Sequence, residues 1–347
     1  MTDSSATVPT PGLPLVAIVT PVYNGARHLE AAMQCVQRQC YPNLVHVVLD
    51  NASTDDTPAI IAAFRDARVP VLSFRNDALL PLQDNWNKAF SHLPADAVYA
   101  KLLCADDLIR SDCIERFVAL AESGPSIEIV LCDDVFDDEV RRANLPGKGP
   151  VLPGIAVARS ILDHSVQWLP YQHLFVRLHD EDRGESFFGH ELNPDPVAVL
   201  RSALRGNFGY LHEPLVYTRW HKDSQTSRNI KVRDAQAWCY ILRLIELFGE
   251  QCFNFDELHH ALDRNVGRQA RFVLRWLIRG EFHAARLLHD QLGLHGAHLN
   301  PLHYLRYALQ WPSYARLKRS WQMPAGPHID EPAFINAPGK HDAHAVS

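Results

Sequence analysis

Three strand-like apolar runs in the first third of the chain each end in a short polar segment. The runs cover residues 16–20, 45–49 and 97–103, and the polar segments cover residues 21–25, 50–57 and 104–107. Helical patterns lie at residues 28–38, 57–66 and 111–120, and a further strand is expected at residues 127–132. Alternating strands and helices predict parallel βαβ units, whose strands end at one edge of the sheet, where open α/β sheets bind ligands. We therefore expect an α/β domain with a ligand site built from the three polar segments.

Composition narrows the class of protein. The 347 residues suffice for about two domains, and an apolar content of 47% can fill a core. A formal net charge of −6 gives no reason to expect nucleic acid as a partner. The seven cysteines are scattered and form no CxxC pair, which argues against zinc and against a disulfide framework. With no signal-like start and no apolar run of about 18 residues, we expect a cytoplasmic protein that does not cross a membrane.

The pattern predicts four parts in the order of the chain. They are a disordered tail at residues 1–14, the α/β domain at residues 15–230, an α-helical region at residues 231–322 and a flexible tail at residues 323–347. Within the α/β domain, the prolines and glycines of residues 133–189, Gly154 among them, predict loops that close over the site. After Arg201 we expect the chain to be helical.

One helix of the C-terminal region has a basic face. Its arginines are Arg264, Arg268, Arg271, Arg275 and Arg279, and apolar residues fall on another face. An ordinary packed helix with a solvated charged face is the favoured interpretation. The alternative is peripheral contact with the inner face of a membrane.

Asp106 and Asp107 form a candidate site for a divalent cation. Mg²⁺ and Mn²⁺ bind carboxylate oxygens and keep positions open for phosphate oxygens. In the structural alternative, Asp107 caps the next helix and Asp106 faces solvent. The other polar segments favour the cation, because a nucleotide diphosphate needs hydrogen-bond partners for its base and a cation for its phosphates.

The ordered series of motifs resembles the inverting family-2 glycosyltransferases with the GT-A fold. The resemblance rests, in order, on residues 20–25, residues 50–57, Asn76, Asn85, residues 105–112 and residues 195–221. It covers about 200 residues, and the order of the motifs is more specific than any single motif. The resemblance implies a Rossmann-like mixed sheet flanked by helices and followed here by an α-helical annex. It also implies a nucleotide-diphosphate-sugar donor and a divalent cation, Mn²⁺ or Mg²⁺.

By the resemblance, Pro21 and Tyr23 line the nucleoside pocket, with Tyr23 near the base. A plain core role is the alternative for Tyr23. Asn51 takes the position of the acid that reads the base in the family, and its amide can both donate to and accept from a pyrimidine edge. Asp50 would then orient the loop.

The resemblance also implies residues around the diphosphate. Arg75 and Asn85 match positions near the uridine and the diphosphate, where a guanidinium would add charge-assisted bonds. A solvated surface charge is the alternative for Arg75. Arg219 and His221 match a closing segment that returns to the diphosphate, and His221 would ligate the metal or bond a phosphate oxygen, with an unremarkable histidine as the alternative.

The metal motif departs from the family pattern. Cys104 stands where the first acid of the family's Asp-x-Asp-Asp motif is expected. Thiolate is a soft ligand that suits Mg²⁺ poorly, so we expect Asp106 to be the main ligand, Asp107 to assist and Cys104 to serve packing. Weaker metal binding follows if the lost acid normally contributes.

Inverting transfer needs a general base that deprotonates the acceptor hydroxyl. The spacing to Arg201 in the family pattern points to Asp195, with Glu191 as a competitor and a helix cap as the structural alternative for Asp195. We therefore predict a metal-assisted transferase that moves a sugar, from a UDP- or dTDP-sugar, to a hydroxyl of a saccharide or lipid-linked saccharide in polysaccharide biosynthesis. One alternative is a catalytically silent sugar-nucleotide-binding or scaffold protein. Another is a nucleotidyltransferase, which would need a glycine-rich phosphate loop near the N-terminus that Asn24 and Gly25 match poorly.

Overall fold

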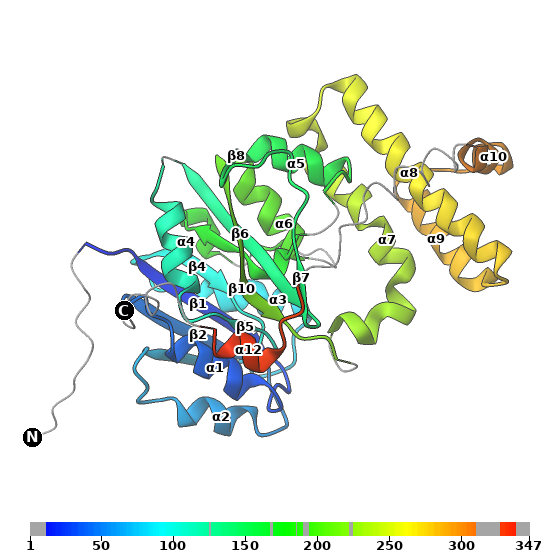
Figure 1. The fold of residues 1–347 in the computed structure, drawn as a ribbon. Helices are drawn as coiled ribbons and strands as arrows, with labels where there is room; N and C mark the ends of the chain where they lie inside the picture. The colour runs from blue at the N-terminus through cyan, green and yellow to red at the C-terminus, as the bar shows by residue number, and fades with distance from the viewer. Residues whose placement is uncertain are drawn as a thin grey trace, which may run out of the picture.

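The computed structural model describes residues 12–124, 126–166, 169–184, 186–189, 194–221, 225–309 and 327–337, with residues 225–238 described by their backbone alone. Within these ranges the chain forms one ten-stranded sheet in the order β3-β2-β1-β4-β9-β6-β10-β5, with β7 beside β6 and β8 beside β10. Figure 1 shows helices on both faces of the sheet and a further group of helices to one side. The predicted α/β class with a C-terminal helical annex is confirmed.

The first half of the sheet is parallel. Its strands are β1 (Leu15–Val22), β2 (Leu44–Asp50), β3 (Val71–Arg75) and β4 (Ala97–Leu102). β1 lies between β2 and β4, and β3 pairs with the far side of β2. β1 and β2 are almost wholly buried, which explains why Val, Ile and Leu dominate them, because a parallel sheet is covered on both faces. The three strand-like runs of the sequence are confirmed as β1, β2 and β4.

Helices cover both faces of this half. They are α1 (Leu29–Gln37), α2 (Thr57–Ala63), α3 (Leu82–Ser91) and α4 (Cys113–Ala121). Phe117 of α4 and Phe90 of α3 are fully buried in separate apolar clusters, which places these two helices on opposite faces. The helices predicted from sequence are confirmed as α1, α2 and α4.

The second half of the sheet mixes strand directions. Its strands are β5 (Leu108–Ile109), β6 (Ile127–Phe136), β7 (Glu139–Arg141), β8 (Val151–Pro153), β9 (Phe175–Arg177) and β10 (Asn207–Thr218). β9 runs antiparallel to both β4 and β6, whereas β6 and β10 are parallel. The sheet is therefore mixed, as expected.

Residues 133–189 are more regular than expected. Besides the end of β6 and strands β7 to β9, they contain α5 (Gly154–Leu162) and the 3-10 turns η1 (Tyr171–His173) and η2 (Asp180–Arg183). Gly154 begins α5 rather than interrupting it. A Cβ at this position would lie 1.8 Å from the carbonyl oxygen of Ala203, so glycine allows α5 to meet the end of α6 (Pro194–Ala203).

The chain after Arg201 also differs from the expectation. It ends α6 and then forms β10 before any further helix begins. The strand was missed because its sequence contains Gly209 and Pro214, which normally argue against a strand. Register shifts in the pairing with β6 surround Pro214, so the ladder accommodates the proline there.

The annex is a group of helices. It consists of α7 (Gln225–Cys252), α8 (Phe255–Ile278), α9 (Phe282–Leu294) and α10 (Pro301–Leu309). α7 begins before residue 231, so the boundary expected between residues 230 and 231 falls inside a helix. Within the described residues, no helix is both long enough and apolar enough to span a bilayer.

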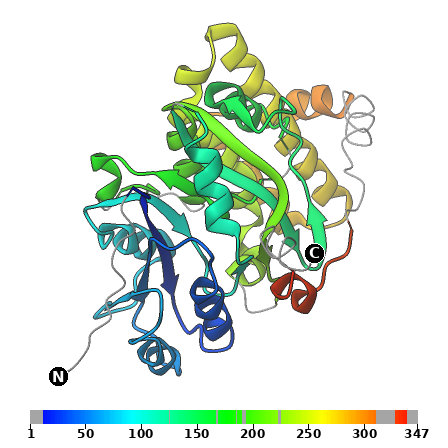
Figure 2. The ribbon, with the colours of Figure 1, turned by 60° about the vertical axis from the view of Figure 1, so that its left-hand side comes forward.

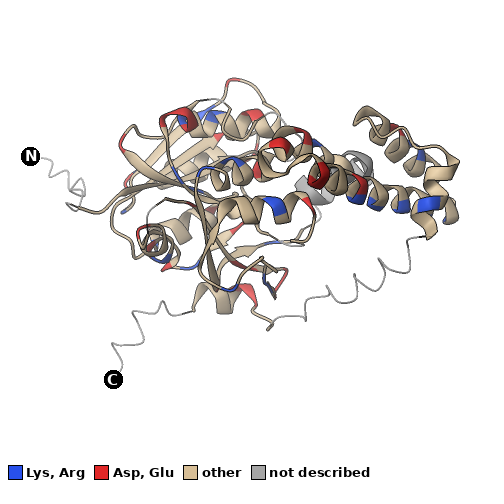
Figure 3. Cartoon of the chain, turned by 90° about the horizontal axis from the view of Figure 1, so that it is seen from above, with Lys and Arg blue, Asp and Glu red and all other residues tan. Residues whose placement is uncertain are grey.

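The arginines of α8 do not form one exposed basic face. Arg271 is buried, and Arg264 forms an ion pair with Asp163 at the end of α5, with a distance of 3.4 Å between Nη1 and Oδ2. In the view of Figure 3, acidic and basic residues are spread over both the sheet domain and the annex. This arrangement fits the favoured interpretation of a packed helix.

Part of the expected C-terminal tail is an ordered element. Within residues 327–337, α12 (Glu331–Ile335) packs on the sheet domain, where Figures 1 and 2 show it in red. Phe334 is 2% exposed and its ring lies 5.5 Å from that of Tyr217 on β10. The expectation of a flexible tail from residue 323 is therefore wrong for this segment, because a buried aromatic anchors it.

Candidate functional site

The first two polar segments interlock at the carboxyl edge of the sheet. Asn24 adopts a left-handed conformation, with φ of 49°, and its Oδ1 accepts a hydrogen bond from the Thr54 amide at 2.8 Å. In return, the amide of Asn24 donates to Oγ of Ser53 at 2.9 Å, and the amide of Gly25 donates to Oγ1 of Thr57 at 2.9 Å. These bonds hold the loops after β1 and β2 against each other.

Asn51 faces into the protein. Its Nδ2 donates to the carbonyl of Leu80 at 2.9 Å, while its Oδ1 accepts from the amide of Leu80 at 2.9 Å and from Nδ2 of Asn76 at 2.8 Å. Asn76 also donates to Oδ1 of Asn85 at 3.0 Å, and all three asparagines are buried. The side-chain amides of these three asparagines therefore brace the loop after β3. One N–H group of Asn51 is not used in these bonds and could contact the base of a nucleotide.

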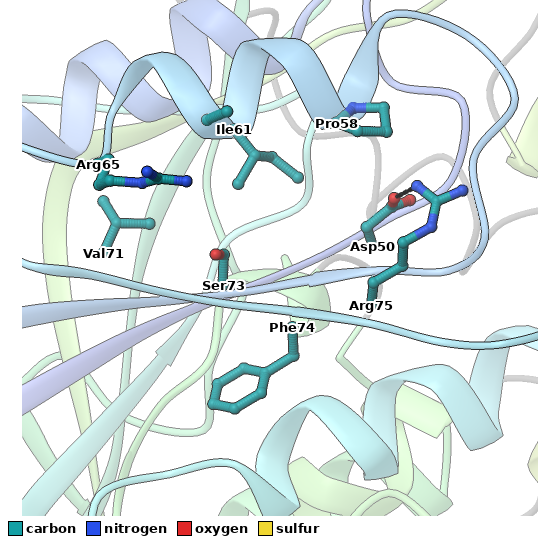
Figure 4. Close-up of a pocket in the computed structure, with 9 residues that line it drawn as sticks. Asp50, Pro58, Ile61, Arg65, Val71, Ser73, Phe74 and Arg75 are labelled. Atoms are coloured by element: carbon teal, nitrogen blue, oxygen red, sulfur yellow. Dashed lines mark hydrogen bonds and ion pairs between the residues drawn. The ribbon is translucent and has the colours of Figure 1, made fainter.

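Asp50 and Arg75 form an ion pair at the ends of β2 and β3. Nη1 of Arg75 contacts Oδ2 of Asp50, and Nη2 donates to the carbonyl of Ser53 at 2.8 Å. Oδ1 of Asp50 accepts from the Ser53 amide at 2.9 Å. The half-exposed Arg75 side chain is thus ion-paired within the loop. Figure 4 shows the pair at one end of a cavity of about 220 Å³ between α2 and β3.

Pro21 and Tyr23 lie at the end of β1 in different environments. Pro21 is buried, whereas Tyr23 is 42% exposed. The core alternative for Tyr23 is therefore wrong. An exposed aromatic ring beside the interlocked loops is free to stack on a ligand.

Cys104, Asp106 and Asp107 converge in the turn after β4. One potential ligand atom from each of these side chains lies within 4.8 Å of the others. Asp107 does not cap α4, because β5 follows it, and Asp106 does not simply face solvent, because its Oδ2 lies 3.0 Å from Nε2 of His221. The alternatives in which Asp107 only caps a helix and Asp106 only faces solvent are therefore wrong.

The carboxyl group of Asp107 is buried beside other carboxyl groups. It is 3% exposed, and burial, followed by the charges of Asp106 and Asp134, raises the pKa of its carboxyl well above the usual range. The buried His173 lies behind it, with Nε2 at 3.6 Å from Oδ2 of Asp107 and 2.9 Å from Oγ1 of Thr218. His173 and Asp134 were not identified from sequence, because they lie in the segment 133–189 that carried no motif.

Arg219 and His221 follow β10 and contact this turn. The amide of Arg219 donates to Oδ1 of Asp107 at 3.3 Å, and its Nη1 donates to the carbonyl of Asp106 at 2.6 Å. The ring of His28 lies 5.0 Å from that of His221. Burial and the charge of Arg219 lower the pKa of His28. Nε2 of His28 and Nδ1 of His221 are buried and have no hydrogen-bond partner among the described residues.

Asp195 occupies the first turn of α6 and is partly exposed. Burial raises the pKa of Cys104 and of Tyr171, and the negative charge of Asp195 adds to this effect. Glu191, the competing base, lies outside the described residues.

Comparison with known proteins agrees with this arrangement. The family described as Glycosyl transferase family 2 matches residues 17–166. Glycosyltransferase GlyG of Streptococcus pneumoniae serotype 4 is 28% identical over 103 residues, which is 29% of this chain and 33% of that protein. The chain thus spans about a third of the length of this relative.

Solved structures share the fold. S. aureus TarS 1-349, in complex with UDP-GlcNAc, superposes with a TM-score of 0.62 at 14% identity, covering 81% of this chain and 80% of TarS. The mannosyltransferase PcManGT from Pyrobaculum calidifontis, in complex with GDP-Man and Mn²⁺, superposes with a TM-score of 0.51 at 18% identity, covering 91% of this chain and 90% of PcManGT. Residues 17–166, which include the loops after β1 and β2 and the Asp106–Asp107 turn, therefore match glycosyltransferase family 2, and the chain shares the GT-A fold of these solved glycosyltransferases.

Proposed function

We propose that this protein transfers a sugar from a nucleotide-diphosphate donor, a UDP- or dTDP-sugar, to a hydroxyl group of a saccharide or lipid-linked saccharide, with inversion at the anomeric carbon. The observation that carries the proposal is the convergence of Asp106, Asp107, Arg219 and His221 beside the loops that follow β1 and β2. Carboxylates, a guanidinium and an imidazole together can bind a diphosphate and its cation. Polysaccharide biosynthesis is the process we assign to it.

The donor set fits a hard divalent cation, Mn²⁺ or Mg²⁺. Two carboxylates lie within 4.8 Å of each other, and their mutual repulsion contributes to the raised pKa of Asp107, which a cation would relieve. Asp106 would hold the ion, with Asp107 and His221 assisting, and Cys104 would serve packing. When bound, the ion would supply electrostatic stabilisation of the departing diphosphate.

The chain's own groups then have separate roles. Arg219 would bind a phosphate oxygen, and Tyr23 would stack on the base above the buried Pro21. Asn85 would face the uridine and diphosphate side of the pocket, with Arg75 held there by its ion pair with Asp50. Asn51 would contribute to base recognition through its remaining N–H.

We propose Asp195 as the general base, acting on the proton of the acceptor hydroxyl. Its partly exposed position in the first turn of α6, together with the effect of its charge on Cys104, supports this role. Asp195→Asn should abolish transfer and retain donor binding, because the amide keeps the shape but cannot accept the proton. Glu191→Gln is the matched comparison: loss of transfer there, with activity kept in Asp195→Asn, would reassign the base.

The second candidate is a silent sugar-nucleotide-binding or scaffold protein. It is favoured by one observation, the presence of Cys104 where the family pattern has an acid. Binding without turnover by the purified protein, across donors and acceptors, would support it.

We propose a cytoplasmic location, supported by the odd number of scattered cysteines, which form no CxxC pair. A lipid-linked acceptor would bring the enzyme to the inner face of the membrane. Ile278 and Phe282, which are 83% and 67% exposed, flank Arg279 at the turn after α8 and are the side chains we propose for that contact. Sedimentation with anionic vesicles, lost in Ile278→Ser with Phe282→Ser, tests it.

A thermal-shift screen tests the donor site. UDP-, dTDP- and GDP-sugars are added with and without Mn²⁺, and a ligand of the native state raises the melting temperature. We expect a Mn²⁺-dependent rise that disappears in Asp106→Ala. Glu250→Ala is the control, because Glu250 is an exposed carboxylate on α7, outside the three polar segments. A shift that survives Asp106→Ala would refute the assigned metal ligand.

A further inference from the structure

Residues 327–337 form an ordered strap on the sheet domain. The amide of Val140 donates to the carbonyl of Pro327 at 3.2 Å, and the amide of Ile329 donates to the carbonyl of Asp138 at 2.8 Å. These bonds attach the strap to the β6–β7 hairpin, and the buried Phe334 anchors its helix α12 against β10. The strap is therefore docked at both ends of its described length.

The strap delivers one carboxylate to the candidate site. Glu331, the first residue of α12, forms a two-pronged ion pair with Arg219: Nε to Oε2 is 2.8 Å and Nη2 to Oε1 is 2.5 Å. The Arg219 side chain is 9% exposed and that of Glu331 is 34% exposed. Hydrogen bonds from Arg219 lower the pKa of Glu331, so the carboxylate is charged at neutral pH. This fork geometry fixes the plane of the guanidinium as well as its position.

The same guanidinium also contacts the Asp106–Asp107 turn. Its Nη1 donates to the carbonyl of Asp106, while the backbone amide of Arg219 donates to the Asp107 carboxylate. Arg219 has five N–H donors on its side chain, and these bonds use three of them. Two N–H donors therefore remain for an anion, while the ion pair with Glu331 fixes the orientation of the guanidinium.

We propose that Glu331 is a positioning residue of the donor site, and that the strap is an integral part of that site. Glu331 holds Arg219 against the Asp106–Asp107 turn so that its remaining N–H groups meet the diphosphate of the donor. This inference rests on the proposed function. It assigns a role to a segment more than 100 residues beyond the motifs in sequence.

Isothermal titration of the full chain with UDP and with dTDP, in saturating Mn²⁺, tests the proposal. Glu331→Gln keeps the size of the side chain and removes its charge. We expect nucleotide binding about tenfold weaker or more, since a charge-assisted pair is lost. Glu331→Asp, which retains the charge, should recover part of the affinity, and Glu250→Gln, an exposed carboxylate on α7, should bind like wild type.

A second measurement separates positioning from simple anchoring of the strap. Hydrogen exchange at the amides of Val140 and Ile329 should stay slow in Glu331→Gln and become fast in Phe334→Ala, which loses its buried anchor. Fast exchange in Glu331→Gln would overturn the positioning role, as would wild-type nucleotide affinity in that variant. A wild-type protein that binds neither nucleotide would instead refute the proposed donor site, and the inference with it.

Discussion

Replacing Asn51 by alanine tests whether this residue braces the nucleotide loop or mainly reads a base. In the structure its side chain makes three hydrogen bonds within the protein, two to the backbone of Leu80 and one to Asn76. Asn51 is 3% exposed, so water cannot easily replace these partners. The substitution would leave the Leu80 N–H and C=O groups without their side-chain partner.

The expected loss follows from the number of bonds. A hydrogen bond within a protein contributes about 0.5–1.5 kcal/mol net, and partners left buried add to the cost, so three bonds predict a loss of about 2–4 kcal/mol in the free energy of unfolding. Asn43→Ala is the control. Asn43 makes one exposed bond, from Nδ2 to the carbonyl of Leu13 at 2.9 Å, and its loss should cost under about 1 kcal/mol.

Equilibrium urea unfolding measures both variants, and UDP titration of the same samples measures binding. If Asn51 braces the loop, Asn51→Ala loses stability and binds nucleotide more weakly, because the loop after β3 is released. A variant as stable as wild type would refute the reasoning. Should that stable variant also lose nucleotide affinity, Asn51 would act as a base reader alone.

Two further predictions concern the fold. Gly154→Ala places a Cβ 1.8 Å from the Ala203 oxygen, a backbone atom that cannot move aside cheaply, so we expect a loss of about 3 kcal/mol or more in urea unfolding; wild-type stability would contradict the packing of α5. Burial lowers the pKa of His46 from its ordinary 6.5 to about 3, so its neutral form stabilises the folded protein fully above pH 6.5 and this contribution is lost as the pH falls toward 3. At about 1.4 kcal/mol per pH unit, unfolding at pH 5 should show an extra loss of about 2 kcal/mol relative to pH 7.5 that is absent in His46→Gln; parallel pH profiles would contradict it.

Strands and helices with strong local patterns could be predicted from sequence. β1, β2 and β4 are runs of mostly apolar residues, and α1, α2 and α4 show helical periodicity. β10 could not be predicted, because its glycine and proline contradict a strand locally, and the pairing with β6 that stabilises it joins segments far apart in the chain. Tertiary packing overrode local preference there.

The candidate site divides in the same way. The sequence motifs identified Asp106, Asp107, Arg219 and His221, and the structure brings these residues together. No local pattern distinguishes Glu331 from the other acidic residues of the chain. Its importance depends on a contact with Arg219 that exists only once the strap has docked.

By itself, the sequence determined the α/β class, the order of the motifs and the residues that follow each strand, because strand and helix periodicity are local properties of the chain. Only the tertiary structure decided which partner each polar group takes. Asn51 turns inward to Leu80, Asp50 pairs with Arg75, and Glu331 returns to Arg219. The physical reason is that a hydrogen bond or an ion pair needs distance and orientation together, and these are set by the packing of segments that are remote in sequence.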